Sequence, residues 1–115
     1  MVAESWLKPW DWYNTNVVSF SKLINKLKSL KIEKFLNFST PEVYGSTEKK
    51  IKENNIFNPT TPYAISRTAQ DLNLQAHSKN FKFPVVFTRT ANIFGPHQQL
   101  YRIVPISIIK AIKNE

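Results

Sequence analysis

Helix-like and strand-like hydrophobic patterns alternate along this chain, and their order is what most limits its fold. After Thr15, apolar side chains recur every three or four residues, which predicts a helix over residues 15–31 with Thr15 or Asn16 as its cap. The apolar stripe of this helix consists of Val17, Phe20, Leu23, Ile24, Leu27 and Leu30. The aromatic-rich run 34–39 is followed by Pro41 and predicts a short buried strand. The run Trp6–Tyr13 lacks periodicity, which indicates a loop or a short helical turn.

The same two patterns return in the second half of the chain. The polar stretch 45–62 predicts a surface loop, and Thr61 followed by Pro62 predicts the start of a helix that runs to about Asn80. The apolar residues at helical spacing in this segment are Ile65, Ala69, Leu72 and Ala76. Residues 84–88 predict a second strand, and residues 105–113 predict a final helix. Helices that alternate with strands are typical of a parallel α/β sheet, so we expect a single domain of that class.

Composition excludes several classes of protein. The 115 residues include no cysteine, which rules out disulfides and thiolate metal sites, and we expect no metal. The formal charge of +8 comes from lysines spread along the chain, so we interpret it as a solvated basic surface and expect no nucleic-acid partner. No apolar run approaches the roughly 18–20 residues of a membrane span. Because the N-terminus also lacks the pattern of a signal peptide, we expect a cytoplasmic protein without a membrane contact.

Three polar segments stand at predicted strand ends or at a helix start. The first strand ends in a hydroxyl and a carboxylate, those of Thr40 and Glu42, at the edge of the sheet where α/β proteins bind ligands. Tyr63 and Arg67 are four residues apart, so a helix places them on one face. A cation beside a phenol favours the phenolate and lowers the tyrosine pKa from about 10, which makes tyrosine a better base. The third segment, Thr88–Pro96, runs from the second strand into a loop.

Each of these segments alone also fits an ordinary strand end or surface helix, but their order resembles one family. The set is similar to extended short-chain dehydrogenases, closest to the dTDP-glucose 4,6-dehydratases and their epimerase relatives. Their pattern runs AAES, TN at a helix start, STDEVYG, PYxxSK, TRxxNxYGP and a KLIP-like segment. The matching stretches here are Val2–Ser5, Thr15–Asn16, Ser39–Gly45, Pro62–Arg67, Thr88–Pro96 and Arg102–Pro105. The resemblance covers essentially the whole chain.

The resemblance implies part of an NAD-binding Rossmann fold, a parallel sheet with flanking helices. Residues 1–96 would belong to its core, and residues 97–115 would begin the substrate-binding region. The strand–GxxGxxG–helix unit that holds the pyrophosphate of NAD is missing, because the chain has only two glycines, Gly45 and Gly95. The C-terminal substrate region is missing too. We therefore expect a central fragment of a longer NAD-dependent enzyme, and we expect the 115-residue chain alone to be inactive.

The catalytic roles follow the family pattern position by position. Tyr63 matches the tyrosine that takes the proton of the sugar 4-hydroxyl while hydride passes to NAD, and Thr40 matches the residue that hydrogen-bonds the same oxygen. Arg67 replaces the lysine that lowers the pKa of that tyrosine. Glu42 matches the dehydratase base for the C5 proton. Pro41 replaces the aspartate that protonates the departing 6-hydroxyl, so the elimination of water lacks its usual acid.

The resemblance also assigns ligand contacts. The residues that it places at the cofactor are Ala3, Glu4, Thr15, Tyr63 and Arg67, with Ala3 to Ser5 at a strand end. The residues that it places at a nucleotide-diphosphate sugar are Ser5, Thr40, Asn92 and Arg102. Ile93 replaces a second asparagine of the family, which removes one hydrogen bond on the cofactor side. No metal contact is implied.

Three interpretations of the function remain open. A dTDP-glucose 4,6-dehydratase-like activity is favoured by Glu42 and opposed by Pro41. A nucleotide-sugar 4-epimerase needs only Thr40, Tyr63 and the cation. A degenerate relative that binds nucleotide sugar without turnover is favoured by Arg67 and Pro41. The family further implies a homodimer in the full-length form, through the helices 15–31 and 63–80.

Overall fold

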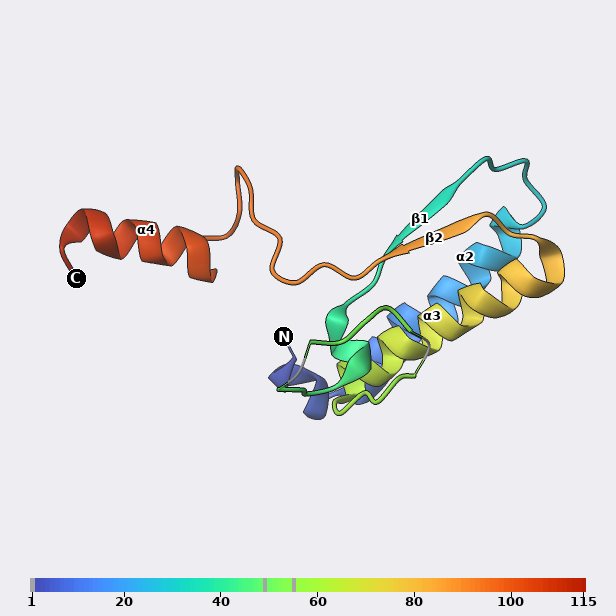
Figure 1. Ribbon diagram of the computed structural model, residues 1–115, viewed down its shortest axis with the longest axis horizontal. Coiled ribbons are helices and arrows are strands. Elements are labelled where there is room, and N and C mark those ends of the chain that lie inside the picture. Colours follow the sequence, from blue (N-terminus) through green and yellow to red (C-terminus); the bar gives the residue numbers. More distant parts are fainter. Residues whose placement is uncertain (1, 49, 55) are drawn as a thin grey trace.

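The computed structural model describes residues 2–48, 50–54 and 56–115. Its centre is a parallel pair of short strands, β1 (Phe35–Phe38) and β2 (Val85–Thr88), in which Phe35 pairs with Val85 and Phe38 with Thr88. Between them the chain passes through the 3₁₀ turn η3 (Pro41–Tyr44) and the long helix α3 (Pro62–Phe81). Figure 1 shows this strand–helix–strand crossover. The α/β class with a parallel sheet is therefore confirmed.

The first helical rod begins earlier than the sequence pattern indicates. It consists of α1 (Pro9–Tyr13), the π-helical stretch η2 (Asn14–Ser19) and α2 (Phe20–Leu27), which follow one another without a break. The predicted cap at Thr15 or Asn16 is wrong, because both residues lie inside the rod. Proline is well suited to the first turn of a helix, where its missing N–H leaves no hydrogen bond unmade. Trp12 of α1 packs edge-on against Tyr63 of α3, with 5.2 Å between the ring centroids. This contact holds the extra turn against α3.

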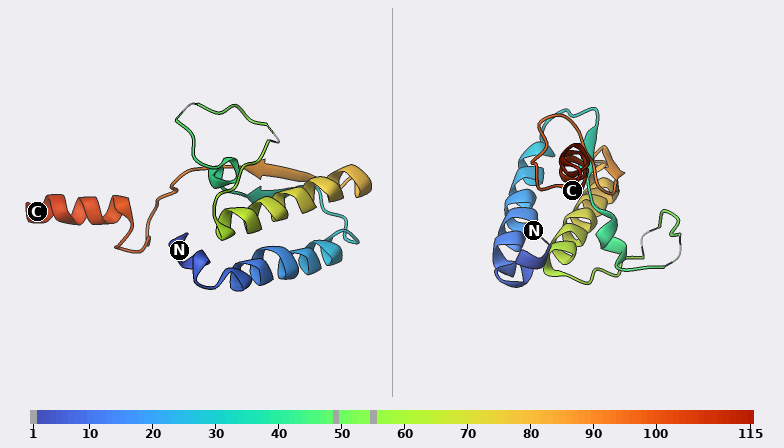
Figure 2. Two further views of the ribbon diagram at one scale, coloured as in Figure 1. Left: turned by 90° about the horizontal axis from the view of Figure 1, so that it is seen from below. Right: turned by 90° about the vertical axis from the view of Figure 1, so that its left-hand side faces the viewer.

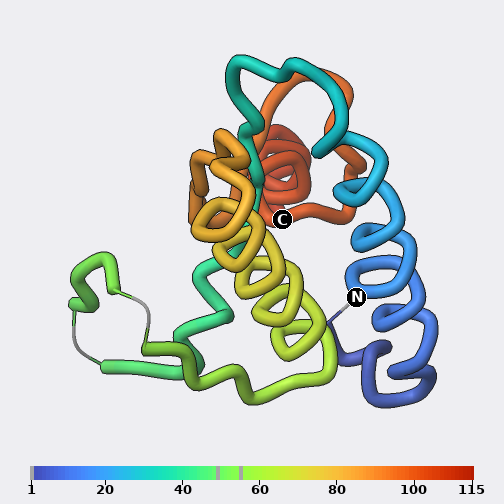
Figure 3. Tube along the Cα trace, turned by 90° about the vertical axis from the view of Figure 1, so that its right-hand side faces the viewer, coloured from blue at the N-terminus to red at the C-terminus, as the bar shows by residue number. Residues whose placement is uncertain are grey.

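The rod and α3 run side by side on the same side of the two strands (Figures 2 and 3). The hydrophobic core between these layers is formed by Ile24, Leu74 and Phe83, and the partly buried residues packed against it are Phe20, Leu27, Ile32, Phe35, Val85 and Phe87. The predicted stripe of the rod is only partly buried, because Leu23 and Leu30 are 46% and 61% exposed. Leu36 and Phe38 on the other face of the sheet are exposed, so the prediction of a buried first strand is wrong.

Helix α3 buries a different face from the one its apolar residues suggest. Ile65 and Leu72 of the predicted stripe are 45% and 49% exposed. The buried residues are Pro62, Ala64, Ser66, Thr68, Gln70, Asp71 and Leu74. This largely polar face can be buried because its side chains are hydrogen-bonded: Gln70 and Asp71 to residues in or next to the strands, Ser66 to Asn16 of the rod, and Thr68 to the backbone of α3 itself.

The last helix, α4 (Ile103–Lys113), starts two residues before the predicted Pro105. It extends away from the body at the end of a long connection and contacts no other helix or strand of the described residues (Figure 1). Within the described part of the chain, no helix is both long enough and apolar enough to cross a membrane. The same residues contain no cluster of three or more histidine or acidic side chains suited to a metal ion.

Candidate active site

A cavity of about 920 Å³ opens at the carboxyl ends of the two strands. Five of the predicted catalytic and ligand-binding residues line it: Thr40, Glu42, Tyr63, Asn92 and Arg102. They come from four separate segments: the end of β1 with η3, the start of α3, the loop after β2, and the start of α4. The structure thus brings together most of the predicted catalytic and substrate-binding residues, while their chemical roles stay predictions.

Thr40 and Glu42 are arranged by a small capping motif. Thr40 has extended backbone angles and its side-chain oxygen accepts a hydrogen bond from the backbone N–H of Glu42 at 3.3 Å, with Pro41 at the first position of η3. A hydroxyl that accepts in this way can still donate its own hydrogen to another group. The Glu42 carboxylate is half-buried, and no group among the described residues forms a hydrogen bond or ion pair with it. It is therefore available to act on a ligand in the cavity.

Tyr63 occupies the first turn of α3. Thr61 caps this helix by accepting from the N–H of Ala64 at 3.1 Å, and the hydroxyl of Ser5 accepts from the N–H of Tyr63 at 3.2 Å. The Tyr63 ring packs edge-on against Trp12, at an interplanar angle of 77°. Within the described part of the chain, the phenol oxygen forms no hydrogen bond. Its ring is thus fixed by packing, and its hydroxyl is available at the cavity.

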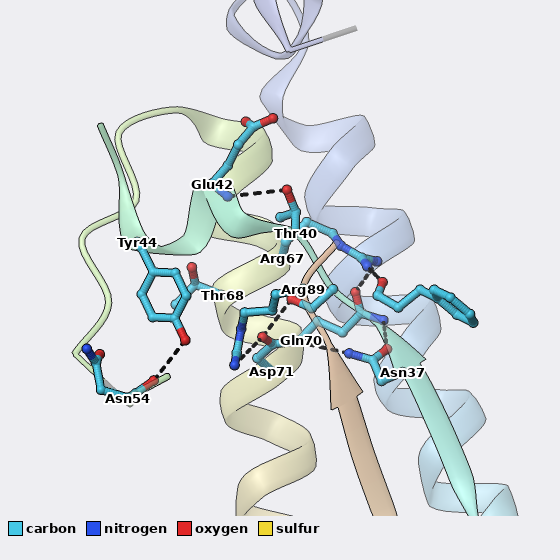
Figure 4. Close-up of polar contacts among 12 residues, drawn as sticks. Asn37, Thr40, Glu42, Tyr44, Asn54, Arg67, Thr68, Gln70, Asp71 and Arg89 are labelled. Carbon is cyan, nitrogen blue, oxygen red and sulfur yellow. Dashed lines mark hydrogen bonds and ion pairs between the residues drawn. The ribbon is translucent and has the colours of Figure 1, made fainter. Parts of the chain in front are cut away.

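Arg67 does not reach toward the cavity. Its guanidinium donates to the backbone carbonyl of Phe38 and, at 2.5 Å, to Oε1 of Gln70 (Figure 4). Arg67 is not among the residues that line the cavity, although Tyr63 one turn earlier is. No hydrogen bond joins the phenol and the guanidinium among the described residues, and their expected pairing stays a prediction. A guanidinium is long and planar, and its two terminal nitrogens bond instead to Phe38 at the end of β1 and to Gln70 on α3.

The predicted ligand contacts near the N-terminus do not line the cavity. Ala3, Glu4 and Ser5 form a 3₁₀ helix, η1 (Ala3–Trp6), and not the expected strand end, because both the N–H and the hydroxyl of Ser5 bond to the carbonyl of Val2. Ser5 is fully buried and its hydroxyl is committed to Val2 and Tyr63. Ala3, Glu4 and Thr15 are exposed, and neither they nor Ser5 line the cavity.

A buried polar network behind the cavity was missed by the sequence analysis. Asp71 of α3 is fully buried, and its carboxylate accepts from Asn37 at 3.0 Å, from Ser39 at 2.7 Å and from Arg89 at 3.0 Å. Figure 4 shows Asp71 between Asn37 and Arg89. One signal could have found it: Asp71 is one of only two aspartates in the chain and follows Arg67 by four residues, on the same helix face.

The guanidinium of Arg89 completes this network with aromatic contacts. It lies over the rings of Tyr44, Phe57 and Phe87, at 5.3, 5.3 and 5.5 Å from their centroids. Cations are attracted to the faces of aromatic rings, and more strongly where water is excluded. Arg89 therefore joins β2, η3 and the long loop before α3 to the carboxylate of Asp71.

Solved structures of longer proteins share this fold. A dTDP-glucose 4,6-dehydratase from Streptomyces venezuelae, solved with NAD and TYD bound, matches with a TM-score of 0.84 and 26% identity over 99% of this chain and 36% of its own. A UDP-N-acetylglucosamine 4-epimerase from Methanobrevibacter ruminantium matches with a TM-score of 0.87 and 27% identity over 100% of this chain and 39% of its own. The expected partial Rossmann fold is therefore confirmed.

Sequence comparison agrees with the structural one. The chain is 36% identical over 102 residues to the human dTDP-D-glucose 4,6-dehydratase, covering 88% of this chain and 29% of that protein. It therefore spans less than a third of that relative's length. The model of the NAD dependent epimerase/dehydratase family matches residues 1–115. The chain belongs to the NAD-dependent epimerase/dehydratase family.

Proposed function

We propose that this chain is the central part of an NAD-dependent enzyme that oxidises the C4 hydroxyl of a nucleotide-diphosphate sugar. The observation that carries the proposal is the shared cavity: Tyr63, Thr40 and Glu42 line one opening at the carboxyl ends of two parallel strands. Ligands of open α/β sheets bind at this edge. Similar proteins of known activity act as nucleotide-sugar dehydratases or 4-epimerases.

In the proposed reaction Tyr63 takes the proton of the sugar hydroxyl. The Thr40 hydroxyl donates a hydrogen bond to the same sugar oxygen, since its hydrogen stays available while its oxygen accepts from the N–H of Glu42. Asn92 and Arg102 line the same cavity and would hold the sugar and its diphosphate. A guanidinium suits a diphosphate because it can donate two parallel hydrogen bonds.

The residues of this chain could hold one part of NAD but not another. Arg67 has no carboxylate partner among the described residues, and its Nε is buried without a hydrogen-bond partner, which suits an arginine beside an additional polar ligand. The residues thus fit the nicotinamide ribose, with Tyr63 beside it, whereas the pyrophosphate needs a glycine-rich loop that this sequence lacks. Ala3, Glu4 and Thr15 do not line the cavity, and only the family resemblance suggests them as cofactor contacts. When bound, NAD supplies the hydride acceptor.

Two outcomes of the same first step compete. Elimination of water needs a base for C5, which the unpaired carboxylate of Glu42 provides, and an acid for the leaving hydroxyl, which Pro41 cannot provide. Epimerisation at C4 needs neither group. The dehydratase is the leading proposal, since relatives that are 36% identical over 102 residues are dehydratases, and the epimerase is the alternative that Pro41 favours.

The proposal is tested in a full-length chimeric protein. We would join the chain to the N- and C-terminal parts of the human relative and supply dTDP-glucose or UDP-N-acetylglucosamine, while following nicotinamide absorbance and product by NMR. We expect turnover of one sugar nucleotide and a loss of roughly 10²–10⁴-fold in Tyr63→Phe, because the base is removed. Tyr13→Phe is the matched control. Equal rates for the parent chimera and Tyr63→Phe would contradict the assignment of the base.

A further inference from the structure

The buried carboxylate of Asp71 is the point at which the elements around the cavity are tied together. Its side chain is 1% exposed, and its ion-pair partner Arg89 is 16% exposed. A carboxylate this deeply buried is stable only if charged and polar donors replace the water that it has lost. Here three donors from two strands do so, and each strand also carries a segment of the cavity.

The donors stand next to the cavity residues in the chain. Ser39 directly precedes Thr40. The 2.7 Å hydrogen bond from its hydroxyl to Asp71 therefore fixes the position at which the segment Thr40–Glu42 leaves β1. Arg89 comes three residues before Asn92, and its ring contact with Tyr44 holds the far end of η3. Asp71 itself lies on α3, two turns beyond Tyr63. One carboxylate thus links three of the four segments that form the cavity.

The same carboxylate determines the direction of a chain of hydrogen bonds. Because Asp71 only accepts, the amide of Asn37 must present its NH₂ group to it, which leaves the Asn37 oxygen to accept from Gln70 at 3.4 Å. The Gln70 oxygen is then free to accept from Arg67 at 2.5 Å. Through two amides, Asp71 therefore decides where the guanidinium of Arg67 is held.

We propose that Asp71 is a positioning residue: without touching the ligand, it holds the end of β1, the start of α3 and the exit of β2 in the arrangement that forms the cavity. The importance of this role for catalysis rests on the function proposed above. The arrangement itself does not, because it is a property of the chain without ligand.

The test measures local amide protection in the 115-residue chain by hydrogen exchange and NMR. The variant Asp71→Asn keeps the shape and removes the charge, and Asp11→Asn, at the exposed second aspartate, is the matched control. The reporters are Ser39 and Glu42 beside the cavity, with Lys28 and Phe35 as remote references; all four amides donate hydrogen bonds. We expect roughly 10- to 100-fold faster exchange at Ser39 and Glu42, because bonds to a charged group are lost, and less than twofold change at the references.

A uniform acceleration of all four amides, or none, would overturn the proposal, since either result assigns Asp71 to general stability or to no role. If Asp71→Asn does not fold, Ser39→Ala decides, because it removes one donor and leaves the ion pair with Arg89 in place. Selective acceleration at Glu42 supports the proposal, and uniform or absent acceleration refutes it. Because no ligand is added, this result is independent of whether the chimera turns over sugar nucleotide.

Discussion

At the scale of single residues, Arg67 and Pro41 distinguish this chain from the family pattern, and both stand at the cavity or directly behind it. The guanidinium of Arg67 is held by Phe38 and Gln70, and among the described residues it forms no hydrogen bond with the phenol that it was expected to activate. Pro41 lines the cavity beside Glu42 but has no proton to donate. Each can be exchanged for the residue typical of the family, and each exchange has a defined expected result.

Replacing Arg67 with lysine should raise the turnover of the chimera by about tenfold or more. A single ammonium cannot bond Phe38 and Gln70 as a fork, so it is free to approach Tyr63 and stabilise the phenolate. The measurement is kcat for Arg67→Lys beside Arg67→Met, which removes the charge at similar length. A lysine variant no faster than the methionine variant would show that the cation has no part in the reaction.

Replacing Pro41 with aspartate should direct the chimera toward dehydration. The carboxyl group would lie at the first position of η3, where helix N-termini favour acidic residues, and next to Thr40 in the cavity. General acids contribute roughly 10²–10⁴-fold, so we expect a gain of that order in 6-deoxy product, read from its new methyl signal by NMR. Pro41→Asn supplies the shape without the proton and should show no gain.

At the scale of elements, the end of η3 depends on one glycine. Gly45 has a φ of 74° and closes η3, and a Cβ at this position would lie 2.2 Å from the backbone oxygen of Asn58. The bond from the N–H of Asn58 to the carbonyl of Val43, at 2.9 Å, fixes that approach. The long loop before α3 is thereby fastened to η3 beside the cavity.

Gly45→Ala should therefore destabilise the chain by at least about 2 kcal/mol, because the left-handed backbone and the close contact both penalise a side chain. The free energy of unfolding would be measured by urea denaturation. Gly95→Ala is the matched control, since a Cβ there meets no atom within 4 Å, and it should change stability by less than about 0.5 kcal/mol. Equal effects at the two glycines would contradict this account of η3.

At the scale of the whole molecule, large apolar surfaces remain uncovered. Exposed apolar side chains lie on one face of the two-stranded sheet, on the outer faces of the two long helices and along α4. They include Leu36, Phe38, Val86, Leu23, Ile65, Leu72, Ile108 and Ile112. Parallel sheets are normally covered on both faces. This agrees with a chain that spans about 29% of its human relative.

The homodimer implied by the family remains a prediction, and the exposed residues of the two long helices are where it would form. Leu72 of α3 is 49% exposed. We expect Leu72→Lys to convert the chimera from dimer to monomer in sedimentation velocity, because a charge would be buried at the interface. Leu100→Lys, at a residue 67% exposed in the connection before α4, should leave the dimer intact. A dimer that survives Leu72→Lys would place the interface elsewhere.

The sequence by itself determined the alternation of the main helices and strands, both strands to within a residue or so, and the Thr61–Pro62 helix start, while the family resemblance named five of the residues that line the cavity. These depend on hydrophobic period, capping and motif spacing, which act over a few neighbouring residues. Only the tertiary structure decided that α3 buries its polar face, that Arg67 turns to Phe38, that the first rod begins at Pro9, and that Asp71 joins the strands. Asp71 meets Asn37 across 34 residues of chain. Whether a polar side chain can be buried depends on donors that distant segments supply, and no local pattern contains that information.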